Sequence, residues 1–587
     1  MFKNINKYGM LKNGTIAVIT MFGVGILFGE KNIMLAFPIA LTSAVLGRQN
    51  FKVKTFNKLF KIILLDLLIV TLAFLSSLNP YIGIVINLIS IFLIIYTIAT
   101  PYDPTFYKPF IMLYIFTQYT TVTFTELPNR YLSVVFGLLV VIICNKVVND
   151  VNEKKILGNS INKSLELISS NLKDILEGKF DGKKELGCTN IMRDLAYKVY
   201  VSRHKGYLTT KLGKIQFKIF MDIEHLNLYS RKIREGYSCK EIKIEEINDL
   251  ITVLDEIKDF SDEEVRISTV VNEINKYVNK YIHKSKYSYE ISTILINLSQ
   301  NITSVYSLEK KDINKVYEGW ERSYFDKSTY VFKEYLKKDS IRFKFAMRMS
   351  ITLSFALLCA EYLGFHKIIW AIITVMSVMQ PYYEDTITKS KDRILGNVIA
   401  IIFTGVIINL INSKYVTIAI LIASLYLLYG FKEYYKISLF AATASICVSS
   451  LSTNINELLI YRVMYVIAGL IIVMLANKFI FPYKLKDGIT ALEKKINMYG
   501  DKLVEEGKAY LKGEGNIHII RDIIIHATLM NQKLYLRNLQ YGDEEVNKFI
   551  YNNHYFIIET GYSILMAYGK SEDYRKMKLE EIIKGTA

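Results

Sequence analysis

Three basic residues and one acidic residue border or interrupt long apolar runs of the sequence. Lys61 and Asp66 lie in KIILLDLLIV, Arg348 lies in FKFAMRMSITLSF, and Arg393 lies in KSKDRILGNVIAIIF. A guanidinium can pair with a carboxylate through two parallel hydrogen bonds. Basic groups at the mouth of a pathway also raise the local concentration of anions. Lys61, Arg348 and Arg393 are therefore candidates for binding a small anion, and the alternative is that they reach out to lipid headgroups.

Asp66 is the acidic residue placed most clearly inside an apolar run. A charge in the middle of a membrane helix costs about 2.5–3.5 kcal/mol on insertion scales, so the carboxylate should face a partner or water. Two roles are open. Asp66 either binds a proton that is coupled to transport, or it pairs structurally with Lys61, five residues earlier.

Aromatic residues stand near the ends of the apolar runs. Tyr382 and Tyr383 follow the Gln380-Pro381 pair that ends one run, and Trp370 lies near the start of the same run. Enrichment of Trp and Tyr at membrane interfaces accounts for such positions. Stacking of Tyr382 and Tyr383 on an aromatic substrate is the alternative.

Motifs for enzyme chemistry are missing from the sequence. We find no Walker A motif, no dinucleotide-binding glycine pattern, no HExxH and no nucleophile elbow. The histidines show no metal spacing, and the five cysteines are scattered without a CxxC pair. The net charge of +18 comes without a nucleic-acid-binding motif. We therefore expect no enzyme, cofactor, metal or nucleic acid.

Apolar and charged residues are segregated along the chain, which is typical of a membrane protein. Hydrophobic residues make up 51% and charged residues 22% of the sequence, and the mean hydropathy is +0.23. Apolar runs near the roughly 20 residues of a membrane helix form two clusters of about six. The first cluster has runs near 14–29, 32–46, 58–78, 81–99, 109–124 and 131–148, and the second near 345–364, 368–379, 394–410, 416–431, 437–451 and 463–481.

Two polar segments with helical periodicity follow the two clusters. Apolar residues recur every three or four positions within them, as in amphipathic helices. The sequence thus predicts an all-α membrane protein with two six-helix transmembrane modules and a helical cytoplasmic domain. The predicted segments are a first module at 1–148, a cytoplasmic domain at 149–340, a second module at 341–482 and a cytoplasmic tail at 483–587.

Basic residues in the loops set the expected orientation. The loops after every second run carry most of the lysine and arginine, and such loops stay on the cytoplasmic side. Both termini are therefore expected in the cytoplasm, with the chain in the inner, or cell, membrane.

The two clusters match as internal copies 332 positions apart. At this offset Arg130 meets Arg462, and Lys61 meets Arg393. Gly137 also meets Gly469, and Asn145 meets Asn477. Because each cluster holds an even number of runs, the copies should be parallel repeats about an axis along the membrane normal.

The second cluster resembles the fusaric acid resistance and aromatic acid exporter family. An arginine opens the first span of a family module, a proline follows the second span, and an arginine with a glycine three residues later opens the third. Here these are Arg348, Pro381, Arg393 and Gly396. The first cluster departs from this pattern, because Gln49, Lys61 and Leu64 stand at the positions of the proline, the second arginine and the glycine.

The resemblance implies export of organic anions, such as aromatic carboxylates. The aluminium-activated malate transporters are similar proteins with one six-span module that is used as a dimer, so the halves here would form a pseudo-dimer around one pathway. We therefore expect secondary efflux of small organic anions across the lipid bilayer by a monomer or a homo-oligomer. The alternatives are an anion channel and a membrane-anchored interaction protein that transports nothing.

Overall fold

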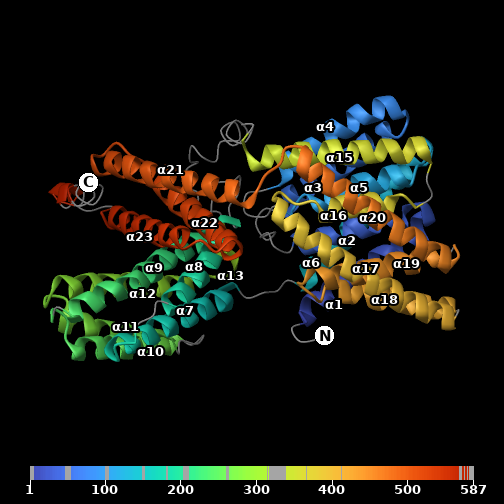
Figure 1. Cartoon of the computed structure of the whole chain (residues 1–587). Coiled ribbons are helices and arrows are strands. Elements are labelled where there is room, and N and C mark those ends of the chain that lie inside the picture. Colours follow the sequence, from blue (N-terminus) through green and yellow to red (C-terminus); the bar gives the residue numbers. More distant parts are fainter. Residues whose placement is uncertain are drawn as a thin grey trace. The chain divides into compact units, whose positions relative to one another are not determined.

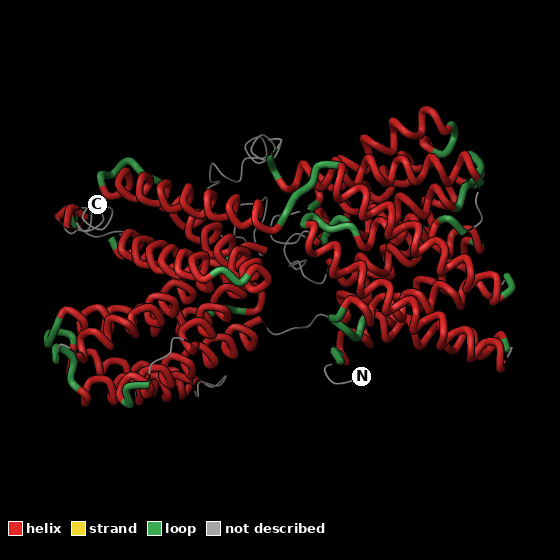
Figure 2. The backbone as a smooth tube through the Cα atoms, viewed as in Figure 1, coloured by secondary structure: helices red, strands yellow, loops and turns green. Residues whose placement is uncertain are grey.

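The chain is all-helical throughout the residues that its computed structural model describes (Figures 1 and 2), and no strand occurs among them. The described residues are 5–46, 55–99, 105–148, 153–179, 183–201, 210–238, 240–258, 264–313, 315, 339–364, 367–411, 413–451, 453–567, 571–573, 575–577 and 580. The predicted all-α fold class is confirmed.

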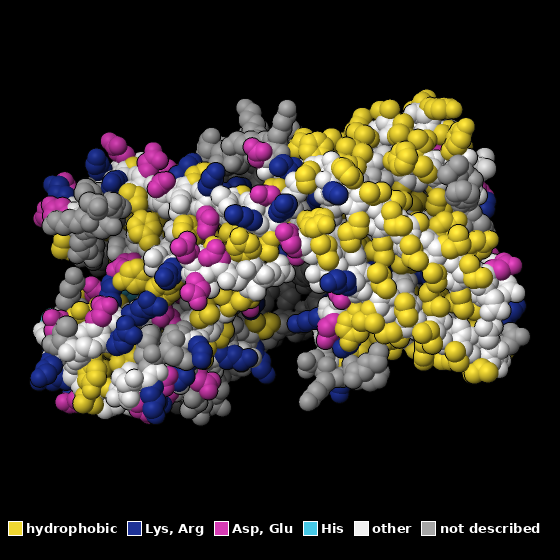
Figure 3. Space-filling view, in the orientation of Figure 1, with side chains coloured by type: hydrophobic (Ala, Val, Ile, Leu, Met, Phe, Trp, Pro, Cys, Tyr) yellow, Lys and Arg dark blue, Asp and Glu magenta, His cyan; other side chains and the backbone are white. Residues whose placement is uncertain are grey.

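The chain divides into two compact units. The membrane unit comprises Met1–Asp150 and Phe332–Gly488, and the helical unit comprises Val151–Val331 and Ile489–Ala587. Hydrophobic side chains cover the visible face of the membrane unit, whereas charged side chains are frequent on the visible face of the helical unit (Figure 3). This contrast is the one expected between a surface in contact with lipid and a surface in contact with water.

Each predicted run of the first cluster corresponds to one helix of the membrane unit. These helices are α1 (Lys7–Phe28), α2 (Glu30–Leu46), α3 (Thr55–Ser76), α4 (Pro80–Ile98), α5 (Lys108–Tyr119) and α6 (Leu127–Val148). Local sequence signals set their ends. The side chain of Asn79 accepts hydrogen bonds from the first amides of α4, and Pro80 follows as the first helical residue.

The second cluster gives six further helices in the same order. They are α15 (Ile341–Leu363), α16 (Ile369–Val378), α17 (Tyr383–Ile411), α18 (Lys414–Leu428), α19 (Tyr434–Ser450) and α20 (Ile455–Phe479). We refer to α1–α6 as module 1 and to α15–α20 as module 2.

Not all of these helices have the length of a membrane span. Among the described residues, seven helices are long and apolar enough to cross a membrane, namely α1, α3, α4, α6, α15, α17 and α20. Helix α16 has 10 residues and α5 has 12. At 1.5 Å per residue α16 is about 15 Å long, roughly half of the hydrocarbon core. The sequence runs therefore predicted the number and order of the helices better than their lengths.

Contacts between the two modules are reciprocal. Helix α4 of module 1 packs on α15, and α1 of module 1 packs on α18. At the 332-residue offset α1 corresponds to α15 and α4 corresponds to α18, so the two contacts are the same helix pairing made twice. Two parallel repeats related by a twofold axis would make such a pair of equivalent contacts.

Close approach of α17 and α19 requires the glycine at position 396. A Cβ atom at Gly396 would lie 2.5 Å from the carbonyl oxygen of Tyr435 and 2.8 Å from Cβ of Ser438. We expect Gly396→Val to lower the thermal unfolding temperature of the detergent-solubilised protein, because overpacking costs about 1–3 kcal/mol. The matched control is Leu64→Val at the repeat position, where the side chain is exposed. Equal unfolding temperatures for both variants would contradict the prediction.

The helical unit is built from antiparallel amphipathic helices. They are α7 (Glu153–Leu176), α8 (Lys183–Val201), α9 (Lys211–Ser238), α10 (Ile244–Lys258), α11 (Glu264–Tyr281), α12 (Lys286–Ser307), α13 (Lys310–Ile313), α21 (Leu485–Leu511, from Ile489 on), α22 (Ile517–Tyr541) and α23 (Glu544–Met566). Helix α9 is central and packs on α7, α8, α12 and α23. The predicted apolar stripes are buried, for example Leu165 and Leu172 of α7 and Leu298 of α12.

A buried carboxyl group in α9 makes the stability of the helical unit depend on pH. Asp222 accepts a hydrogen bond of 2.6 Å from Nδ2 of Asn301, and burial raises its pKa to about 7. The folded state therefore holds this proton more tightly than the unfolded state, whose Asp pKa is about 4. Stability should fall as the pH rises from about 4 to above 7, in total by about 4 kcal/mol.

Asp222→Asn should remove this pH dependence and stabilise α9 and α12 at pH 8. The measurement is hydrogen exchange of peptides from the two helices at pH 5 and pH 8, corrected for the intrinsic rates. Glu177→Gln, at an exposed position of the same unit, serves as the control. The same protection in the wild type at both pH values would show that Asp222 ionises without cost.

Candidate functional site

The short helix α16 lies among three helices that each contribute one buried arginine. It packs on α15, α17 and α20 (Figure 1), and these helices carry Arg348, Arg393 and Arg462. The three side chains are exposed by 0%, 4% and 2%. Gly469 brings α20 against α16, because a Cβ atom there would lie 2.8 Å from the carbonyl oxygen of Ala371.

Arg462 is held at the N-terminal turn of α16. Its Nε donates to Oδ1 of Asn397 at 2.9 Å, and its Nη1 donates to Oγ of Ser445 at 3.3 Å. The guanidinium also lies 5.0 Å from the centre of the Trp370 ring, a cation–π contact. Neutral groups on α16, α17 and α19 thus fix the side chain and leave its positive charge uncompensated.

Arg393 adds a second positive charge to the same place. It precedes Asn397 by one turn of α17, and its guanidinium acts electrostatically on that of Arg462. The Nε atom of Arg393 is buried and has no hydrogen-bond partner. Within the described part of the chain, no carboxylate forms an ion pair with either arginine. Burying two like charges is costly unless an opposite charge joins them. We call Arg393, Arg462, Asn397, Ser445 and Trp370 the arginine cluster.

The corresponding arginine of module 1 is fully engaged. Arg130 Nε donates to Oδ1 of Asn32 at 3.1 Å, and Nη1 donates to the carbonyl oxygen of Thr117 at 3.0 Å. Its Nη2 donates to Oγ1 of Thr120 at 3.1 Å and approaches the carbonyl oxygen of Lys31 at 3.4 Å. Arg130 therefore holds α2, α5 and α6 together.

Lys61, the repeat counterpart of Arg393, is exposed on α3. The first module consequently has no second buried cation at this place, and the two modules differ although their helices correspond.

Arg348 occupies a separate position at the other end of α16. Its Nη2 donates to the carbonyl oxygens of Gln380 and Pro381 at 2.9 and 2.8 Å, just beyond the last turn of the helix. A cation at a helix C-terminus is favoured by the helix dipole. Nε and Nη1 of Arg348 are buried without partners. Arg348 thus fixes the turn between α16 and α17, and its Nε and Nη1 atoms remain able to donate hydrogen bonds.

The two tyrosines after Pro381 contact the end of module 2. Tyr382 is buried, its ring lies 5.8 Å from that of Tyr483, and it packs against Gly488. The backbone amide of Tyr383 donates to the carbonyl oxygen of Tyr483 at 3.0 Å. The structure therefore places Tyr382 in a packing contact and does not bring it to the arginine cluster.

Asp66 lies on the buried side of α3 and is 1% exposed. Neither carboxylate oxygen accepts a hydrogen bond from the described residues. Lys61 is exposed and does not pair with Asp66. The hypothesis of a structural Lys61–Asp66 pair is therefore wrong.

Reasoning from sequence missed Arg462 as a functional residue, together with Asn397, Ser445 and Trp370 as its contacts. The match of Arg130 with Arg462 at the 332-residue offset was the available signal. An arginine well inside an apolar run is costly, and its repetition in both modules could have identified it as buried.

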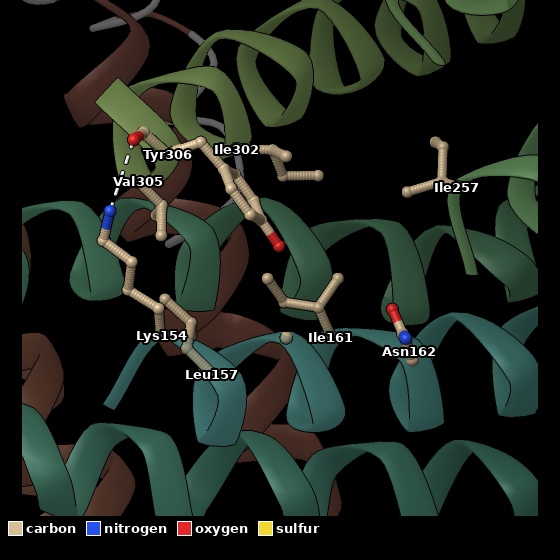
Figure 4. A pocket seen from close by; sticks show the side chains of 9 residues that line it. Lys154, Leu157, Ile161, Asn162, Ile257, Ile302, Val305 and Tyr306 are labelled. Atoms are coloured by element: carbon tan, nitrogen blue, oxygen red, sulfur yellow. Dashed lines mark hydrogen bonds between the residues drawn. The ribbon is translucent and has the colours of Figure 1, made fainter. Parts of the chain in front are cut away.

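A small pocket of the helical unit does not provide a competing anion site. It lies between α7 and α12, and its lining is mostly apolar (Figure 4). The one basic residue of this lining is Lys154, and its amine donates to the carbonyl oxygens of Tyr306 and Leu308 at 3.2 and 2.6 Å. These carbonyl oxygens at the end of α12 already accept hydrogen bonds from the amine and hold it there.

Comparison with known proteins identifies the part of the chain that contains the arginine cluster. Residues 355–476 match the family described as fusaric acid resistance protein-like. The matched range includes all five residues of the cluster, and it ends before the helical unit resumes. Searches of curated proteins and of solved structures give no match to the chain.

Proposed function

We propose that this membrane protein, whose residues 355–476 belong to the fusaric acid resistance protein-like family, is a secondary transporter that exports small organic anions. Membership of this family and several apolar helices indicate a transporter. The finer proposal is that the anion binds at Arg393 and Arg462.

The observation that carries this proposal is the uncompensated charge of the arginine cluster. A carboxylate beside Arg393 and Arg462 would supply the negative charge that neither guanidinium meets in the described part of the chain, and an acceptor for Nε of Arg393. The N-terminal end of α16, where Trp370 contacts Arg462, adds the positive end of a helix dipole. Fixed donors and a helix end near the middle of a membrane are the means by which transporters hold anionic substrates.

The two modules have unequal roles in this proposal. Module 2 forms the anion pathway beside α16, and Arg348 lies at its cytoplasmic entrance. Module 1 supports it through the α4–α15 and α1–α18 contacts. We place the termini and the helical unit in the cytoplasm and the chain in the inner membrane, because the basic loops favour that orientation.

Anion flux into proteoliposomes tests the proposed function. Purified protein is reconstituted and supplied with radiolabelled monocarboxylates, aromatic and aliphatic, with and without the same anion inside. A carrier should show uptake that is stimulated by internal anion. Uptake without such stimulation, reversing with membrane voltage, would identify an anion channel instead. Failure of every carboxylate to enter faster than into empty vesicles would overturn transport and favour the interaction-protein alternative.

A further inference from the structure

We propose that the carboxyl group of Asp66 binds and releases the proton whose inward movement drives anion export. This inference rests on the proposed function and adds the coupling ion to it. Asp66 would take up a proton from the outer side and release it to the cytoplasm in each transport cycle, while the anion moves in the opposite direction.

The position of Asp66 is suited to a proton-binding site. It lies near the middle of α3, ten residues before Ser76 at the outer end, which corresponds to about 15 Å of helix. The side chain is buried, and both of its oxygens lack a hydrogen-bond partner in the described part of the chain. Acidic residues within membrane helices mark ion pathways and proton relays when no structural partner explains them.

Among the described side chains, no charged group on the neighbouring helices engages this carboxyl group. Helix α3 packs on α4, α5 and α6. Helix α4 has no charged residue, α5 has Lys108 as its first residue, and α6 has Arg130 and Lys146 near its two ends. Arg130 donates to groups of α2 and α5 instead. With respect to the described side chains, Asp66 can therefore gain or lose a proton without breaking an ion pair.

Polar side chains of α3, α4 and α5 gather near the outer end of module 1. The hydroxyl of Tyr114 donates to Oδ1 of Asn87 at 2.7 Å, and Nε2 of Gln118 donates to the same oxygen at 2.6 Å. Ser76, on the buried side of α3, lies within hydrogen-bond reach of Tyr114. This group offers polar contacts on the outer side of Asp66, from which the proposal has the proton arrive.

The repeat also separates the proton site from the anion site. The counterpart of Asp66 is Val398, which is exposed on the surface of α17. The counterparts of Arg462 and Arg393 in module 1 are the fully bonded Arg130 and the exposed Lys61. Each site thus occurs once, in a different module. Contacts between α4 and α15 and between α1 and α18 connect the two modules that would move together.

The decisive experiment compares wild type with Asp66→Asn in proteoliposomes that contain a pH-sensitive dye. Asparagine has nearly the same shape and adds no charge, so the variant should fold, which size-exclusion chromatography checks. Asp66→Asn should lose anion-dependent proton uptake and accumulation driven by a pH gradient, yet retain exchange of internal for external anion at equal pH. Asp66→Glu should restore part of the proton uptake. Glu126→Gln, which removes an exposed acid paired with Lys31, is the control and should behave as wild type.

Three outcomes would separate the two proposals. Proton uptake by Asp66→Asn at the wild-type rate would overturn the role of Asp66. Net anion transport by the wild type without any proton movement would also overturn it and would leave anion transport intact. Lack of anion exchange by the wild type would instead overturn the transport function on which the inference rests.

Discussion

Arg393→Gln will lower the rate of anion transport by about 10- to 100-fold without lowering the stability of the protein. The estimate follows from the loss of one charge-assisted interaction with the anion, about 1.5–3 kcal/mol, at 1.4 kcal/mol for each factor of ten. Stability should not suffer, because Nε of Arg393 has no partner and its positive charge repels Arg462. Initial rates of anion exchange and the thermal unfolding temperature in detergent are the two measurements.

Lys61→Gln is the matched control for this prediction. Lys61 stands at the same place of module 1, carries the same charge and is exposed. Its replacement should leave both the transport rate and the unfolding temperature unchanged. Equal losses of transport in the two variants would mean that surface charge, rather than the arginine cluster, controls the flux. Normal transport by Arg393→Gln would remove this residue from the pathway.

Arg130→Gln will destabilise the membrane unit by about 3 kcal/mol or more. Removing the guanidinium leaves buried acceptors on Asn32, Thr117 and Thr120 without donors, and each such loss costs about 1–3 kcal/mol. The expected result is a lower thermal unfolding temperature and weaker protection of α2 and α5 from hydrogen exchange.

Arg130→Lys separates shape from charge in this prediction. A lysine amine cannot match the planar fork that donates to groups of α2 and α5, so it should also destabilise the protein. If Arg130→Gln instead kept the wild-type unfolding temperature and lost transport, Arg130 would belong to the anion pathway.

The all-α fold class and the order of the membrane helices could be predicted from the sequence, because the positions of the apolar runs determine both. Every apolar run became a helix, since backbone groups in lipid must satisfy one another within the helix. Length was harder to predict. The apolar run near 394–410 gives α17, yet this helix begins at Tyr383, because the charged residues before the run continue the same helix. Hydropathy marks only the apolar part of such a helix.

The candidate site, too, could be predicted from the sequence only in part. Its motif identifies Arg393 in the sequence, whereas the sequence marks Arg462 only as part of the repeat, because the proximity of α17 and α20 is not encoded locally. The Lys61–Asp66 pair failed for a local reason that could have been foreseen. Residues five apart on a helix point about 140° away from each other, so Lys61 is exposed while Asp66 is buried.

The paired contacts of α1 with α18 and of α4 with α15 bear on how such a chain can evolve. In a pair of identical chains, any substitution appears on both sides of the twofold axis, so two arginine clusters or none would be present. Joining the halves into one polypeptide removes that constraint while keeping the α1–α18 and α4–α15 contacts in place. One half can then keep Arg393 and Arg462 while the other acquires Asp66. A single covalent chain thereby lets a symmetric scaffold hold two different sites.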